Sequence, residues 1–85
     1  MNYYLGEILE RNGELEYNCK YLFATSKNPD KYTDKIARDW RCSSKKDWDD
    51  YCQGYWANDT LIFADGCKEI PKEDFEVLQK YLSVL

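Results

Sequence analysis

The dipeptide Asn12-Gly13 lies between two stretches in which apolar and polar residues alternate, within residues 3–24. Both residues tolerate the positive φ angles of a two-residue type I′ turn, so the segment predicts an antiparallel β-hairpin. Residues that share one face of this hairpin are expected to line the core. They are the predicted pairs Tyr4–Tyr21, Gly6–Cys19 and Ile8–Tyr17, together with Leu15 and Phe23.

A helix is expected to follow the first hairpin. Asn28 is a suitable N-cap and Pro29 suits the first helical position, so we predict a helix from there to about Arg41. At 100° per residue its apolar side chains fall on one stripe, which faces away from a row of lysines and arginines. The apolar stripe consists of Tyr32, Ile36 and Trp40.

The second half of the chain predicts another hairpin and another helix. Residues 51–57 and 60–64 flank Asn58-Asp59, which places Trp56 opposite Leu61, and residues 42–50 before them are read as a polar loop. A short strand over residues 67–70 is expected after a turn at 65–66. A final helix then starts at Pro71, and its apolar positions Phe75, Leu78, Leu82 and Leu85 extend the pattern to the last residue.

These elements predict one α+β domain over residues 1–85, in the order β-β-α-β-β-α. The two hairpins would form an antiparallel sheet, and both helices would pack on its aromatic face. A chain of 85 residues is short for a domain, so each large apolar side chain matters for the core. Eight Tyr, three Trp and three Phe supply most of that apolar surface, and we expect an aromatic core.

The composition argues against catalysis. The chain has no histidine, which excludes a Ser-His or Cys-His nucleophile pair. Its four cysteines form no Cys-x-x-Cys pair, and the acidic run at residues 47–50 does not fit the calcium-loop template. We therefore expect no enzyme activity, no metal and no cofactor. The first residues lack the features of a signal peptide, which favours a cytoplasmic protein with reduced thiols.

Charge is segregated along the chain. Residues 1–26 carry a net charge of −2, residues 27–46 of +4 and residues 47–85 of −6, which sum to the formal net charge of −4. Patches of charge steer association more than totals do, so a partner of either charge can find a complementary face.

The acidic segments favour a protein partner with a basic surface. In length, acidity, aromatic content and lack of catalytic groups, the chain resembles small inhibitors encoded by phages and mobile elements, including anti-CRISPR proteins. This resemblance is one of composition. It implies a non-enzymatic protein-binding module that inhibits a nucleic-acid-processing enzyme by blocking its surface with acidic and aromatic residues. The expected contact residues are Glu7, Glu16, Asp47, Trp48, Asp49, Asp50 and Asp59.

The basic segment supports an alternative function. Lysine and arginine on one face of the first helix can neutralise phosphates, which predicts a nucleic-acid-binding domain. Asp30 and Asp34 lie toward the same face and compensate part of its charge. The residues of this alternative site are Lys31, Lys35, Arg38, Lys45 and Lys46.

Two further expectations concern other partners. The chain has no apolar run of about 18 residues, so we expect no membrane association. Leu5, Leu9 and Leu22 lie on the hairpin face opposite the expected core, where they need a cover and would suit a homodimer.

Overall fold

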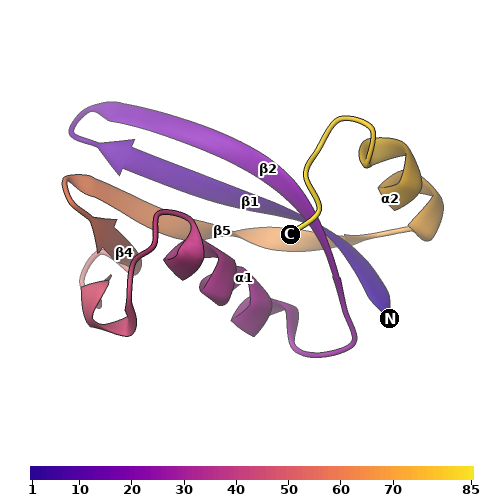
Figure 1. Ribbon diagram of the computed structural model, residues 1–85, viewed down its shortest axis with the longest axis horizontal. Helices are drawn as coiled ribbons and strands as arrows, with labels where there is room; N and C mark the ends of the chain where they lie inside the picture. Colours follow the sequence, from indigo (N-terminus) through magenta and orange to yellow (C-terminus); the bar gives the residue numbers. More distant parts are fainter.

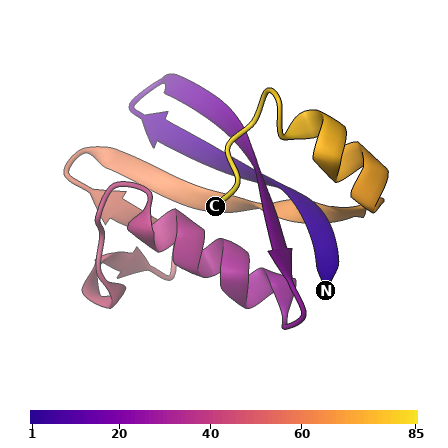
Figure 2. The same cartoon turned by 45° about the vertical axis from the view of Figure 1, so that its right-hand side comes forward.

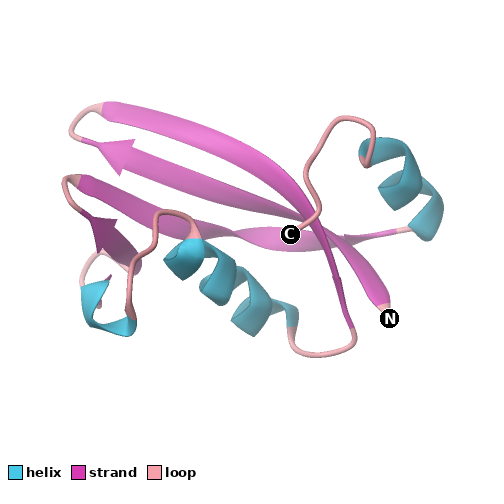
Figure 3. Cartoon of the chain, in the orientation of Figure 1, coloured by secondary structure: helices cyan, strands magenta, loops and turns pink.

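The computed structural model describes all 85 residues and contains five strands, two α-helices and one 3₁₀ helix (Figure 3). The strands form one antiparallel sheet in the order β2-β1-β5-β4-β3 (Figure 1). The predicted α+β fold is confirmed. The elements are β1 (Asn2–Asn12), β2 (Leu15–Thr25), α1 (Pro29–Asp39), the 3₁₀ helix η1 (Lys45–Asp47), β3 (Trp48–Asp49), β4 (Gly54–Ala57), β5 (Thr60–Ile70) and α2 (Lys72–Leu78).

The first hairpin forms, but its turn lies one residue later than predicted. The two loop residues are Gly13 and Glu14, and only Gly13 has a positive φ, of 60°, as in a type II′ turn. This displaces the register by two residues, so Tyr4 pairs with Phe23 instead of Tyr21. The predicted pairs are therefore wrong, yet every side chain keeps its predicted face because the strand repeat is two residues.

The second hairpin turns at Asn58-Asp59, and Trp56 pairs with Leu61 as predicted. Its first strand is shorter than expected, because residues 51–53 form a turn before β4.

Strand β5 continues through the turn that was predicted at Asp65-Gly66. Opposite the single residue Glu7 of β1, β5 has these two residues, which form a β-bulge with Gly66 at a φ of 91°. The expected short strand over residues 67–70 is therefore the second half of β5.

Helix α1 begins as predicted and ends slightly earlier. The Asn28 side chain accepts a hydrogen bond of 2.9 Å from the backbone N–H of Asp30, and Pro29 is the first helical residue. The helix ends at Asp39, and Cys42 then adopts a φ of 61°, which turns the chain away from the helix axis. Residues 42–50 were expected to be a loop, but they contain η1 and β3.

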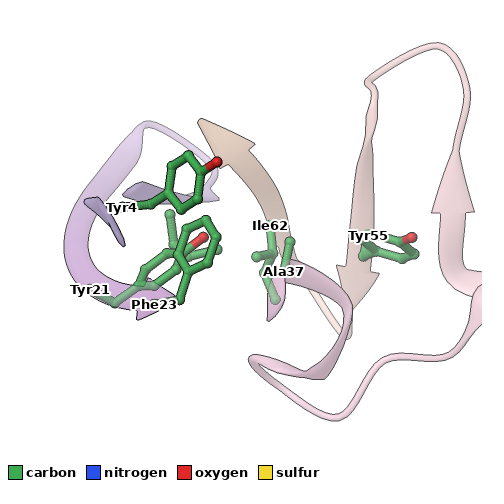
Figure 4. Packing of buried hydrophobic residues seen from close by; sticks show 7 residues of the cluster. Tyr4, Tyr21, Phe23, Ala37, Tyr55 and Ile62 are labelled. Atoms are coloured by element: carbon green, nitrogen blue, oxygen red, sulfur yellow. The ribbon is translucent and has the colours of Figure 1, made fainter. Parts of the chain in front are cut away.

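The core lies between the sheet and α1 and is aromatic, as predicted. The ring of Phe23 stacks on Tyr4 at 5.0 Å between centroids and on Tyr32 of α1 at 4.8 Å. Ile36 and Trp40 pack against the same cluster. Figure 4 shows the rings of β1 and β2 on one side of Ala37 and Ile62, with Tyr55 beyond them. The buried cluster consists of Tyr4, Ile8, Tyr21, Phe23, Ala37, Tyr55 and Ile62.

Two residues predicted to line the core are exposed. Leu15 and Tyr17 are 59% and 57% exposed, although they share the face of Tyr21 and Phe23. They lie near the tip of the β1–β2 hairpin, which extends past the end of α1 (Figure 1). The helix is too short to cover this part of the sheet.

Helix α2 packs against the end of β1. Phe75 is buried, and its ring lies 4.9 Å from the ring of Tyr3. Tyr3 and Tyr4 project to opposite faces because side chains alternate along a strand. Helix α1 thus covers the aromatic face, and α2 contacts a residue of the other face. Neither helix has the length and apolar character needed to cross a bilayer.

The chain after α2 returns to the outer edge of β2 (Figure 2). The predicted helix to Leu85 is wrong, since α2 ends at Leu78. The N–H of Leu22 donates to the carbonyl of Ser83, and its carbonyl accepts from the N–H of Leu85, both at 2.8 Å. Leu22 is fully buried, so it is not an exposed part of the expected dimer face.

Candidate functional site

The side chain of Asp49 organises the turn between β3 and β4. Its Oδ1 accepts hydrogen bonds from the backbone N–H groups of Tyr51 at 2.9 Å and Cys52 at 3.1 Å. Its Oδ2 accepts from the indole N–H of Trp56 at 2.9 Å. The Trp56 bond, followed by the backbone bonds, holds the pKa of Asp49 below its usual value. Asp49 is therefore an ionised structural group of this turn.

The neighbouring carboxylates have separate hydrogen-bond partners. Asp47 accepts from the backbone N–H of Ser44 at 2.7 Å and from its hydroxyl at 3.2 Å, which caps η1. Asp50 accepts from the indole N–H of Trp48 at 2.6 Å. The structure contains no group of three or more acidic, Cys or His side chains placed to hold a metal ion.

Three aromatic side chains are exposed around this turn. Tyr51 is 95% exposed, whereas Trp48 and Trp56 are 37% and 38% exposed. Trp48 contacts the ring of Tyr55 edge-on at 4.9 Å, and a carboxylate fixes each indole N–H. Trp48 pairs with Tyr55 across the strands and shares its face of the sheet. Trp56 follows Tyr55 in β4, so its side chain projects to the opposite face. The end of the sheet thus presents ordered rings on both sides, with Tyr51 between them in sequence.

An open hollow lies between this turn and the sheet face opposite α1. Its volume is about 500 Å³. Leu9 of β1 and Phe63 of β5 are cross-strand partners on that face, and Arg11 lies over the Phe63 ring at 5.3 Å. We call this the Tyr51 hollow. Its lining residues are Leu9, Arg11, Tyr51, Cys52, Gln53, Phe63, Ala64 and Asp65.

No protein-family model, curated protein or solved structure matches this chain. The chemistry of the site is therefore argued from its own contacts, exposure and charges.

The other predicted acidic contact residues lie on the same molecule in separate places. Glu7 accepts a hydrogen bond of 2.7 Å from Asn18, and Glu16 forms an ion pair of 2.8 Å with Arg11. By strand pairing, Glu7, Glu16 and the hollow share one sheet face. Asp59 is exposed in the β4–β5 turn.

The predicted basic face is present on α1. Lys31 and Lys35 are exposed and have no ion-pair partner, and Arg38 is half-buried, 3.7 Å from Asp39. Asp34 was expected to compensate this face. Its two carboxylate oxygens instead accept from the Tyr55 hydroxyl at 2.9 and 3.0 Å, which directs the group toward β4.

The basic face does not continue along one helix beyond α1. Lys45 and Lys46 lie in η1, after the change of direction at Cys42. Arg41 pairs with Glu10 of β1, and the hydrogen bond raises the pKa of Arg41. The alternative site is therefore divided between α1, which carries Lys31, Lys35 and Arg38, and η1, which carries Lys45 and Lys46.

Sequence reasoning did not identify the residues that line the hollow. Tyr51 and Phe63 were assigned only to the two strands of the second hairpin. One signal was available, because Leu9 was recognised as an apolar residue on the polar hairpin face that needs a cover. The opposing strand, and hence the hollow, depends on the β1–β5 pairing, which has no local signature in the sequence.

Proposed function

We propose that this chain is a small, non-enzymatic protein-interaction module that binds a basic surface of a nucleic-acid-processing enzyme and blocks it. The Tyr51 hollow is the centre of the proposed contact. The single observation that carries this proposal is the almost complete exposure of Tyr51 on a turn that Asp49 holds in place.

Exposed tyrosine and tryptophan side chains are suited to dominate a protein interface. They bury a large area, and interfaces concentrate their binding energy in a few such residues. Because three hydrogen bonds to Asp49 order the turn before binding, association loses little conformational entropy there. The Leu9–Phe63 floor offers an apolar surface beside Tyr51 for a side chain of the partner.

The charges around the hollow favour a basic partner. Asp50 and Asp65 are exposed next to Tyr51 and the hollow, and the one basic residue of its lining, Arg11, is paired with Glu16. Carboxylates steer association with a lysine-rich or arginine-rich surface, such as one that binds nucleic acid. Occupying that surface prevents nucleic acid from binding without any bond being made or broken.

The proposal is tested by capture on the immobilised protein from an extract of its natural host, with identification by mass spectrometry. A nucleic-acid-processing enzyme should be captured, and added DNA or RNA should compete for it. Tyr51→Ala and Asp65→Lys should each reduce the capture. Tyr81→Ala, at a residue that is 79% exposed but distant in sequence from the hollow, is the matched control. Capture that is equal for Tyr51→Ala and Tyr81→Ala would refute the proposed site.

A second function, nucleic-acid binding by α1, is favoured by one observation. Lys31 and Lys35 have no ion-pair partner, and Asp34 is engaged by Tyr55. This function predicts salt-dependent binding of duplex DNA or RNA by the purified protein, measured by fluorescence anisotropy. Lys31→Glu with Lys35→Glu should abolish that binding. Anisotropy that stays flat for the unaltered protein at low salt rules this function out.

A further inference from the structure

Strand β2 has an open outer edge along half of its length. Both backbone groups of Leu22 point outward, since they bond to Ser83 and Leu85 of the C-terminal segment. Backbone groups alternate in direction along an antiparallel strand. Those of Glu16, Asn18 and Lys20 therefore also point outward, and none of them has a backbone partner.

This edge is suited to pair with a further strand. It is part of an 11-residue strand without proline, whereas the opposite edge of the sheet is β3, of two residues. Long open edges are templates for pairing unless a protein protects them. Here the C-terminal segment covers the edge at Leu22 through a single parallel bridge to Val84, so the outward backbone groups at this point are accessible to another segment. The exposed side chains of Leu15 and Tyr17 lie beside the open half.

We propose that the open half of β2 pairs antiparallel with the same edge of a second copy of this chain, which forms one continuous sheet across a dimer. The C-terminal segment limits which residues of the two β2 strands can pair. It occupies the edge from Tyr21 onward, because Ser83 lies opposite Tyr21. The β1–β2 turn of the second copy can therefore reach no further along the edge than Lys20. The register that satisfies this condition, and that uses most of the open edge, has its two-fold axis at Tyr17.

The pairing that results is self-complementary. Tyr17 faces the partner's Tyr17, which covers two exposed rings. Glu16 and Asn18 exchange about four backbone hydrogen bonds with the partner's Asn18 and Glu16. Lys20 lies opposite the partner's Glu14, and the symmetry repeats this pair of opposite charges.

A second copy fits this edge because the charges of the strand are arranged around Tyr17. Glu14 and Lys20 are equally distant from it in sequence and opposite in charge. Both are exposed, and neither has an ion-pair partner within the chain. Glu16 and Asn18 keep their bonds to Arg11 and Glu7 of β1, so the pairing leaves the existing ladder intact.

Sedimentation equilibrium of the purified protein, from about 1 to 500 μM, tests the proposal. We expect a monomer–dimer equilibrium that weakens as salt is added. Asn18→Pro removes an outward N–H and leaves the β1–β2 bonds in place, so it should raise the dissociation constant at least about tenfold. Asn18→Ala is the matched control, because it retains the N–H. A protein that is monomeric throughout the range, or equal dissociation constants for the two variants, would overturn the proposal.

An exchange of charges tests the register independently, even if circular dichroism shows that Asn18→Pro is unfolded. Glu14→Lys places like charges opposite each other and should weaken the dimer, whereas Glu14→Lys combined with Lys20→Glu should restore it. Failure of the combined variant to recover the dimer would contradict the pairing at Tyr17. Tyr51→Ala should leave self-association unchanged, so the outcome is independent of the proposed inhibitory function.

Discussion

The Tyr21 hydroxyl is buried without a hydrogen-bond partner, so we expect its removal to change the stability of the protein in an unusual direction. The residue is only 1% exposed, and burial raises the pKa of its hydroxyl far above the ordinary value. Its ring lies over Gly6, so closely that a Cβ at position 6 would come within 2.5 Å of a ring carbon. The hydroxyl therefore loses its hydration on folding and gains nothing in return.

Tyr21→Phe should consequently stabilise the protein. Burial of an unpaired hydroxyl costs about 1–3 kcal/mol. Its removal leaves a cavity of about 10 Å³, which costs about 0.2 kcal/mol at the usual 24 cal/mol per Å³. The net expectation is a gain of about 1–3 kcal/mol in the free energy of unfolding. For a domain of this size, each kcal/mol raises Tm by about 4–8 °C.

Tyr55→Phe is the matched comparison at a tyrosine whose hydroxyl is satisfied. Tyr55 is also buried, and its hydroxyl donates to the Asp34 carboxylate. Loss of a hydrogen bond to a charged group should destabilise the protein by about 1.5–3 kcal/mol. Urea denaturation followed by far-UV circular dichroism measures both variants. Destabilisation by Tyr21→Phe of more than about 1 kcal/mol would refute the reasoning, because it would mean that the hydroxyl has a partner.

Two further substitutions, and the pH dependence of Tyr55→Phe, test other contacts of the structure. Gly6→Ala should lower the free energy of unfolding by about 1–3 kcal/mol, measured in urea, because the Tyr21 ring must move; an unchanged midpoint would contradict this close approach. The lowered pKa of Asp49 stabilises the folded state above about pH 4, and this contribution is lost as the pH falls further. Asp49→Asn should therefore flatten the acid limb of a plot of Tm against pH, and an unaltered limb would argue against the carboxylate contacts. Burial and Asp34 raise the pKa of Tyr55, so stability should decline above about pH 10, and Tyr55→Phe should reduce that decline in the same plot.

The sequence predicted side-chain faces better than strand partners. A slip of two residues in the first hairpin leaves Tyr4 and Phe23 on the core face, because the strand pattern repeats every two residues. The residues of this loop can form a two-residue turn at 12–13 or at 13–14. The sequence pattern therefore does not decide between the two turns. The bulge at Gly66 was read as a turn for a related reason, since glycine permits either.

Long-range contacts account for the other differences. The spacing of Leu78, Leu82 and Leu85 predicted a longer helix, but α2 ends at Leu78, and the segment after it makes long-range hydrogen bonds to the backbone of Leu22. The crowded carboxylates of residues 47–50 were predicted to meet a partner. Asp47 caps η1 and Asp49 orders the β3–β4 turn, whereas Asp50 and Tyr51 are exposed, and no local pattern in the sequence separates these roles.

The proposed function rests on Tyr51, and a binding titration with the captured enzyme tests it most directly. Isothermal titration calorimetry would compare the unaltered protein with Tyr51→Ala and Tyr81→Ala. An interface residue of this exposure is expected to contribute about 2 kcal/mol, so Tyr51→Ala should raise Kd about thirtyfold. Tyr81→Ala should change Kd by less than about twofold. Equal Kd values for Tyr51→Ala and the unaltered protein would contradict the proposal that the Tyr51 hollow is the binding site.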